Sequence, residues 1–283
     1  MGDRGGKIGA SCHPVNPTRP VSMSLPSLLY RFGGRMVADG LDILVPPRCA
    51  VCHDDLPSGR GGRIGPGGGS NGPLLCPSCH GSLMTDSPRC SVCGERTTAV
   101  PPCQGCRRMQ HGCSGLAVLG GYGDQLRTAI LRCKRPGRDP LTTVLAGLIV
   151  SRHRPTFAAW GVGLVVPVPM HWSRRMMRGT SAADELAGAV AVHLRLPCDR
   201  VLRRVVATRM QNELPVTERR GNVATAFRVR GMVKGKRILL VDDVCTTGAT
   251  LAACSEQLTA AGAQAVYAAV VAKADRSSDP GDD

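Results

Sequence analysis

The C-terminal part of the chain alternates between short apolar runs and helical patterns. Residues 163–168, 238–241 and 265–272 are runs of apolar side chains, which is typical of strands buried on both faces. Residues 181–196 instead repeat apolar side chains at helical spacing, and another helix is expected from Leu251 onward. Strands that alternate with helices predict an α/β fold with a parallel sheet and right-handed crossovers.

Other segments carry weaker patterns. A helical stretch is expected over residues 122–150, with a break near Pro136-Gly137. Residues 201–209 favour a strand, and the arginine-rich residues 217–226 favour a helix. Upstream, residues 25–45 are mildly amphipathic and predict a short helical lead-in that ends before two prolines.

The candidate chemistry lies at the end of the central strand, where residues 237–251 read RILLVDDVCTTGATL. Asp242 and Asp243 are predicted at the carboxyl end of that strand, the place where open α/β sheets bind ligands. A small, hydroxyl-rich turn follows, made of Thr246, Thr247, Gly248, Ala249 and Thr250. Backbone N–H groups at the start of the next helix would cradle a phosphate. An ordinary strand–turn–helix would not explain two adjacent carboxylates beside such a turn.

Composition favours a globular protein with phosphate-rich partners. The chain has 283 residues, of which 42% are hydrophobic, and 36 Lys and Arg against 21 Asp and Glu give a net charge of +15. Such an excess suits nucleic acid or small phosphorylated ligands, although a generally arginine-rich proteome would also produce it. The sequence holds no apolar run of membrane-spanning length and no signal-peptide core, so a cytoplasmic protein without membrane insertion is expected.

The cysteines form a metal-binding pattern. Eight of the fourteen stand in four CxxC pairs, which are Cys49/Cys52, Cys76/Cys79, Cys90/Cys93 and Cys103/Cys106. Two such pairs complete a tetrahedral Cys₄ zinc site, so four pairs predict two structural zinc ions. Because each site carries a charge near −2, metal binding would lower the net charge to about +11. The remaining cysteines are expected to be plain thiols, although a helix start near Cys245 could lower its pKa.

The spacing alone leaves the pairing open. Sequential pairing, the favoured arrangement, gives a double zinc ribbon, and alternate pairing gives a cross-braced unit. His53, His80 and His111 lie near the cysteines and are alternative ligands, but four complete pairs make them unnecessary. The glycine-rich residues 59–72 read as a flexible loop, and the GxGxxG pattern inside them has no strand before it.

Residues 237–251 resemble the phosphoribosyl-diphosphate signature of type I phosphoribosyltransferases. The order of several motifs makes the chain similar to the ComF family over roughly residues 40–273: the cysteine-rich head, LRCKRPGRDPL, VVPVP with an arginine-rich loop, TRMQNEL, RRGN and VDDVCTTGATL. This resemblance implies a type I phosphoribosyltransferase domain behind a zinc-binding head. Some ComF proteins are needed for uptake of single-stranded DNA in natural transformation, so single-stranded DNA and a competence helicase are implied partners.

The resemblance also implies roles for individual residues. Asp242 and Asp243 would hold the ribose of Mg²⁺-bound phosphoribosyl diphosphate and act in catalysis, and the turn at 246–250 would wrap its 5′-phosphate. Cationic side chains would neutralise the diphosphate, and the candidates are Lys134, Arg174, Arg175 and Arg178. For the three arginines a solvated basic loop is an equal alternative. One departure matters: family members commonly read RRGFNQ where this chain has Arg-Gly-Thr-Ser-Ala-Ala at 178–183.

Five regions are expected, namely a disordered N-terminus at 1–24, a helical lead-in at 25–48, a double zinc ribbon at 49–115, a phosphoribosyltransferase-type domain at 116–275 and a disordered tail at 276–283. Translation from Met23 is an alternative start. Three functional hypotheses stay open. The chain is an enzyme that transfers phosphoribosyl groups to an unidentified acceptor, a non-catalytic module that senses a nucleotide and binds single-stranded DNA or a helicase, or an adaptor with a relict site.

Overall fold

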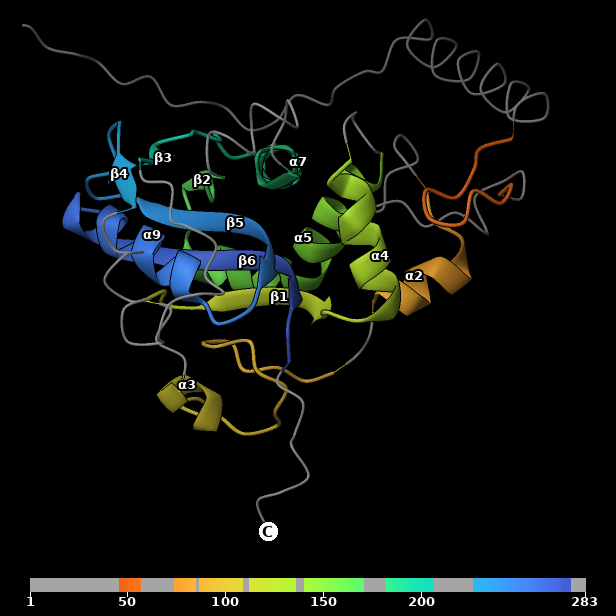
Figure 1. Ribbon diagram of the computed structural model, residues 1–283, viewed down its shortest axis with the longest axis horizontal. Coiled ribbons are helices and arrows are strands. Elements are labelled where there is room, and N and C mark those ends of the chain that lie inside the picture. Colours follow the sequence, from red (N-terminus) through yellow and green to blue (C-terminus); the bar gives the residue numbers. More distant parts are fainter. Residues whose placement is uncertain are drawn as a thin grey trace, which may run out of the picture. The chain divides into compact units, whose positions relative to one another are not determined.

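Four parallel strands form the central sheet in the order β1–β6–β5–β2 (Figure 1). They are β1 (Leu116–Gly121), β2 (Leu164–Pro167), β5 (Arg237–Cys245) and β6 (Ala265–Lys273). The two central strands carry apolar residues on both faces, and residues 238–241 of β5 are fully buried. The parallel α/β sheet expected from the apolar runs is therefore present.

These elements come from a computed structural model that describes residues 46–56, 74–84, 87–108, 112–135, 140–170, 182–205 and 226–275. Contacts join residues 46–283 into one compact unit. Several expectations lie outside the described residues: the N-terminus at 1–24, the helical lead-in at 25–45, the glycine-rich loop at 59–72, nearly all of the helix at 217–226, and the tail at 276–283.

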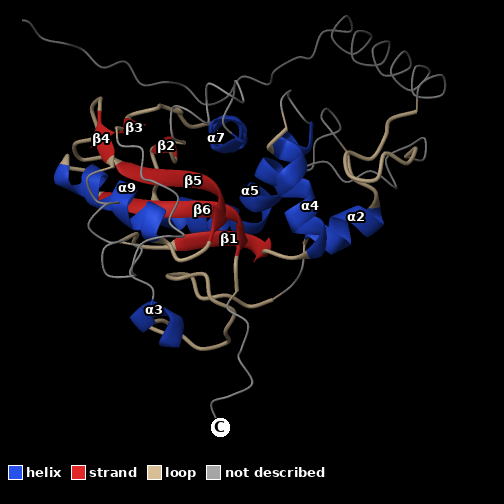
Figure 2. Ribbon diagram, in the orientation of Figure 1, coloured by secondary structure: helices blue, strands red, loops and turns tan. Residues whose placement is uncertain are grey.

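Helices cover the two faces of the sheet (Figure 2). One apolar cluster joins alternate β5 residues such as Leu239 and Val241 to α4 (Asp124–Cys133), α5 (Pro140–Trp160) and α7 (Ala182–Leu194). The other cluster joins Ile238 and Leu240 to α9 (Ala249–Ala260) and to a small ribbon. This alternation follows from the two-residue period of a strand.

The small ribbon corrects one expectation. Residues 201–209 were expected to form one strand, but β3 covers only Leu202–Arg204 and Val205 already lies in a loop. β3 pairs antiparallel with β4 (Phe227–Val229) outside the main sheet. Pairing with the three residues of β4 sets the length of β3. The arginines at 203 and 204 explain its place outside the main sheet, because a strand with charged side chains does not suit the centre of a buried sheet.

Both outer edges of the main sheet are covered by short segments. At β1, the Leu116 N–H donates to the Ser91 carbonyl over 2.9 Å. At β2, the Val165 N–H donates to the Pro197 carbonyl over 3.0 Å, and its own carbonyl accepts from Asp199 over 3.0 Å. Edge strands otherwise present unpaired backbone groups.

Two cysteine-rich modules precede the sheet. The first module, described at residues 46–56 and 74–84, contains α2 (Pro77–Leu83); the second module, residues 87–108, contains α3 (Gln104–Arg108). Leu56, Leu75 and Leu83 of the first module belong to the same apolar core as α4 and α5. The second module instead has its own small cluster around its cysteines. Among the described residues, no helix is both long and apolar enough to cross a bilayer.

Candidate functional site

The carboxyl end of β5 extends beyond its neighbour β2. Pairing with β2 stops at Val241, whereas β6 continues beside β5 until Lys273 lies opposite Cys245. Asp242 and Asp243 are therefore strand residues with β6 on one side and no pairing to β2 on the other. The sequence placed them after a strand ending at Val241, and continued pairing with β6 is the reason that the strand is longer.

The turn after β5 has the geometry of a phosphate-binding turn. Thr246 and Thr247 are exposed, and Gly248 has a φ of 79°, a left-handed conformation that glycine adopts without steric cost. α9 begins at Ala249, two residues earlier than expected, and the Thr247 hydroxyl accepts from the Ala249 N–H over 3.4 Å. Gly248 at the N-cap offers no side-chain acceptor, so N–H groups of the first turn are available to a ligand.

Lys134, the residue that follows α4, forms an ion pair with the second aspartate. The Lys134 ammonium lies 2.8 Å from an Asp243 carboxylate oxygen, and these side chains are 29% and 20% exposed. The Asp243 N–H donates to an Asp242 carboxylate oxygen over 2.8 Å. Lys134, which the sequence suggested as a diphosphate contact, thus lies beside the two aspartates that the sequence suggested as the ribose site.

The electrostatics of the pair favour a neutral Asp242. Burial, followed by the neighbouring Asp243 charge, raises the pKa of Asp242 to about 8, while the hydrogen bond from the Asp243 N–H and the Lys134 charge oppose the shift. At neutral pH a large fraction of Asp242 is therefore protonated. Cys245 shows the opposite of what was expected near a helix start, because its burial raises its pKa to about 11. Burial therefore disfavours the thiolate form of Cys245 at neutral pH.

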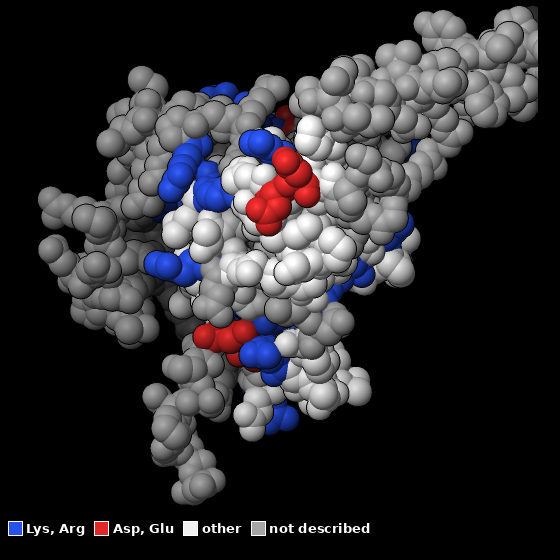
Figure 3. Space-filling view, turned by 90° about the vertical axis from the view of Figure 1, so that its right-hand side faces the viewer, with Lys and Arg blue, Asp and Glu red and all other residues white. Residues whose placement is uncertain are grey.

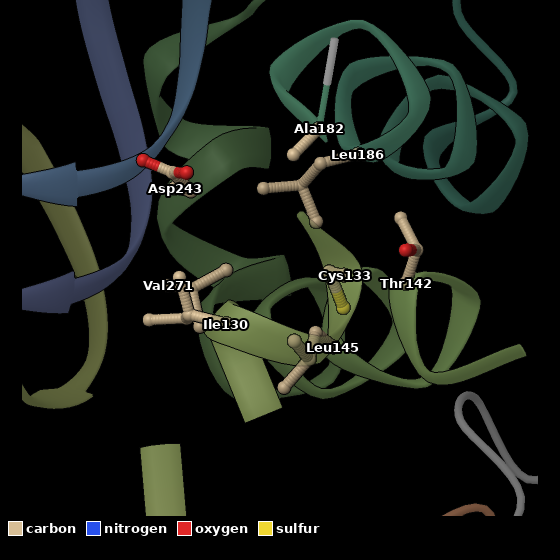
Figure 4. A pocket seen from close by; sticks show the side chains of 8 residues that line it. All are labelled: Ile130, Cys133, Thr142, Leu145, Ala182, Leu186, Asp243 and Val271. Carbon is tan, nitrogen blue, oxygen red and sulfur yellow. The ribbon is translucent and has the colours of Figure 1, made fainter. Parts of the chain in front are cut away.

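Asp243 also lines a small, partly open pocket between β5, β6, α4, α5 and α7 (Figure 4). Its other lining residues are Ile130, Cys133, Thr142, Leu145, Ala182, Leu186 and Val271. The volume is about 10 Å³, enough for roughly one water molecule. A sugar phosphate does not fit in so small a space. The remaining candidates for diphosphate binding, Arg174, Arg175 and Arg178, lie outside the described residues.

The eight paired cysteines gather into two groups of four, Cys49/Cys52/Cys76/Cys79 and Cys90/Cys93/Cys103/Cys106, as sequential pairing requires. Within each group all sulfur atoms lie within 4.8 Å of one another. Measured sulfur–sulfur distances are 3.9 Å in the first group and 3.5 to 3.8 Å in the second. A tetrahedral zinc with Zn–S bonds of about 2.3 Å separates its ligands by about 3.8 Å, so both groups could hold zinc. Neither His53 nor His80 belongs to these groups.

The second module is attached through ion pairs that the sequence did not reveal. Lys273, only 1% exposed at the end of β6, lies 3.1 Å from the Glu95 carboxylate. Arg89 makes two parallel contacts of 2.7 and 2.8 Å with Asp275 and also donates to the Gly94 carbonyl. The one signal in the sequence was Lys273, a lysine at the end of a run of apolar strand residues. A buried charge requires a partner, so this position predicts an acidic side chain nearby.

Comparison with known proteins defines the class. A family model described as the phosphoribosyl transferase domain matches residues 180–283. Together with the parallel sheet and the turn after β5, this match gives the C-terminal part of the chain a type I phosphoribosyltransferase fold.

Relatives extend the similarity beyond the residues that the family model matches. The chain is 28% identical to DNA utilization protein YhgH of Escherichia coli K12 over 229 residues, which cover 79% of this chain and 96% of the relative. It is 27% identical to competence protein F of Haemophilus influenzae over 235 residues, which cover 80% of this chain and 97% of the relative. These matches confirm the resemblance to the ComF family.

Among solved structures, the glutamine phosphoribosylpyrophosphate amidotransferase from B. subtilis aligns with a TM-score of 0.35 and 19% identity. That alignment covers 50% of this chain and 30% of the other. A score of this size adds nothing to the argument from the family model.

We expect the Asp242→Asn variant to lose less stability than the parent between pH 6 and pH 8. The folded pKa of Asp242 is raised above its unfolded value, so its contribution is present at low pH and is lost as pH rises towards about 8. One such group changes the free energy of unfolding by at most about 1.4 kcal/mol per pH unit. Denaturant titrations at several pH values test this; parallel curves for both proteins would contradict the raised pKa.

Metal analysis of the purified protein should find about two zinc ions per chain, since each group of four cysteines forms one closed site. Cys79→Ser should lower the content towards one. Cys198→Ser is the matched control, because Cys198 is exposed and belongs to neither group. A parent with one zinc or none, and with freely alkylated paired cysteines, would exclude a double zinc ribbon.

Glu95→Gln should destabilise the protein by roughly 3 kcal/mol, because it leaves the buried Lys273 ammonium without its counter-ion. The double variant Glu95→Gln/Lys273→Met should recover much of that loss, since it removes the unpaired charge as well. Glu256→Gln, at an exposed position on α9, serves as control. The single variant Lys273→Met completes the cycle, and a loss in the double variant equal to the sum of the two single losses would show that the pair contributes no coupling energy.

Proposed function

We propose that the chain binds phosphoribosyl diphosphate with Mg²⁺ at the carboxyl end of β5. The observation that carries this proposal is the direct succession of two carboxylates and a turn with a left-handed glycine at the start of α9. The turn, residues 246–250, would receive the 5′-phosphate on its N–H groups and hydroxyls. Asp242 and Asp243 would hold the ribose hydroxyls, and Mg²⁺ would be held chiefly by ligand oxygens and water.

Charge at the site supports the entry of a polyanion. Without ligand, Lys134 balances Asp243 and a large share of Asp242 is protonated, so the two carboxylates present little net negative charge to an incoming diphosphate. Lys134 then lies close enough to exchange its partner for a diphosphate oxygen. Arg174, Arg175 and Arg178 are proposed as further diphosphate contacts.

The same groups suit phosphoribosyl transfer. The bond between the anomeric carbon and the diphosphate oxygen breaks, and the bond to an acceptor nucleophile forms at that carbon. Positive charge develops on the ribose ring in between, and the Asp243 carboxylate would stabilise it once Lys134 has exchanged this partner for a diphosphate oxygen. The two zinc sites are structural in this proposal, because four cysteine ligands leave no position for a substrate.

A non-catalytic binding module is the second candidate. The net charge of +15 favours a nucleic-acid partner. Among the described residues on the face shown in Figure 3, basic side chains occupy several separate patches. Names of relatives that refer to competence and DNA utilization motivate a role in DNA uptake in the cytoplasm, with single-stranded DNA or a helicase as partner.

Binding and turnover can be separated directly. Radiolabelled phosphoribosyl diphosphate should bind in the presence of Mg²⁺, and release of diphosphate with a panel of acceptor bases reports transfer. Binding without release would favour the sensing module. Single-stranded DNA titrated at low and high salt tests the nucleic-acid partner, because phosphate contacts weaken steeply with salt. No binding of either ligand would contradict both candidates.

The double variant Asp242→Asn/Asp243→Asn should fold with a thermal midpoint within a few degrees of the parent, since Asn keeps the size and polarity of both side chains. Phosphoribosyl diphosphate with Mg²⁺ should raise the midpoint of the parent and raise that of the variant much less. Asp199→Asn, at an exposed position, is the control. A variant stabilised as strongly as the parent would show that the pair is not the ribose site.

A further inference from the structure

One end of α4 lies against the first cysteine module and against the acid pair at the same time. The Arg132 guanidinium donates to the Val51 carbonyl over 2.8 Å and to the Ala50 carbonyl over 3.0 Å. Both carbonyls belong to the turn between Cys49 and Cys52. Two residues after Arg132, the chain presents Lys134 to Asp243.

The backbone between these two contacts is short and hydrogen-bonded. The Lys134 N–H donates to the Ile130 carbonyl over 3.2 Å, and the Arg135 N–H donates to the Arg132 carbonyl over 3.0 Å. A displacement of Arg132 therefore moves the backbone that carries Lys134. The half-buried ion pair between Lys134 and Asp243 depends on that backbone, because a small displacement would lengthen its 2.8 Å separation beyond hydrogen-bond distance.

The same module also contacts the first turn of α4. The Ser82 hydroxyl, at the end of α2, donates to the Gln125 side-chain carbonyl over 2.6 Å. Between the two polar contacts, Leu83 and Leu126 belong to one apolar core. The first module thus holds α4 near both ends, whereas the second module contacts the ends of β1 and β6.

Metal binding bears on the Arg132 contact in two ways. A Cys₄ zinc site fixes the turn whose carbonyls accept from Arg132, since the flanking cysteines become ligands of one ion. Its net charge near −2 also attracts a guanidinium at hydrogen-bond distance from that turn. Without metal, four neutral thiols or mutually repelling thiolates supply neither effect.

We infer that metal bound by the first cysteine group positions Lys134 beside Asp243, with Arg132 as the positioning residue between them. The contacts that carry this inference are independent of any ligand, and its consequence for phosphoribosyl diphosphate rests on the proposed function. The site at the end of β5 is then responsive to zinc although no cysteine of the group belongs to it.

Hydrogen exchange on the zinc-loaded full chain, without ligand, tests the inference. Arg132→Met should exchange roughly tenfold faster in peptides covering residues 130–135 and 242–250, which corresponds to the loss of about one charged hydrogen bond. Peptides from α7 should be unchanged. Arg127→Met, an exposed position on the same helix, is the matched control, and Arg132→Lys should restore protection in part because one ammonium cannot span both carbonyls as well as a guanidinium.

A second pair of variants addresses the metal itself. Cys52→Ser should release one zinc and reproduce the faster exchange at 242–250, whereas Cys106→Ser should release the other zinc and leave residues 130–135 protected. If Cys52→Ser fails to fold, removing zinc from the parent with a chelator replaces it, and unchanged exchange at 242–250 after zinc loss would overturn the inference; the Arg132 series tests the contact itself. Unchanged exchange at 242–250 in Arg132→Met would overturn the inference and show that apolar packing alone places α4.

Thermal midpoints with and without Mg²⁺ and phosphoribosyl diphosphate separate this inference from the proposed function. Reduced stabilisation of Arg132→Met, with normal stabilisation of Arg127→Met, supports both. Faster exchange in Arg132→Met together with no stabilisation of the parent supports the inference and contradicts the proposed function. Full stabilisation of both variants with unchanged exchange leaves the proposed function standing and overturns the inference.

Discussion

The pairing of β5 with β6 is the constraint on which the candidate site depends. Because β6 pairs with β5 as far as Cys245 while β2 stops at Val241, the acid pair lies within a paired strand and still has one side without pairing to β2. The turn that follows β5 therefore begins at a fixed position. At the other end of the turn, Leu251 and Leu258 of α9 pack into the core. A loop in the same place would need many more contacts to hold two carboxylates against their mutual repulsion.

Around that strand end, charges occur in compensated pairs that join distant parts of the chain. Lys134 meets Asp243, Lys273 meets Glu95, and Arg89 meets Asp275. Each pair links an element of the sheet domain either to another such element or to a cysteine module. Buried charges of this kind add little net stability, but they penalise every arrangement in which a partner is missing. They therefore favour one assembly of the modules over the alternatives.

The sequence was most informative where the pattern was local. Apolar runs revealed β2, β5 and β6, and CxxC spacing revealed two groups of four sulfur atoms, because both signals arise within a few residues. The hydrogen bonds from Arg132 to the Ala50 and Val51 carbonyls join residues some eighty positions apart. For Lys273, the sequence indicated only that a charged residue stands at the end of an apolar strand. Such contacts follow from tertiary packing, which a single sequence does not display. β3 was overextended for the same reason, since pairing with β4 set its length.

The covered edges of the sheet have a consequence for the solubility of the protein. A four-stranded parallel sheet has two outer strands whose backbone groups can recruit a strand from another molecule. Here Ser91 of the second module occupies the start of β1, and residues 197–199 occupy β2. The second module thus covers the start of an edge strand whose backbone groups could otherwise pair with another molecule. A chain that loses this module exposes β1 and gains a route to strand-mediated aggregation.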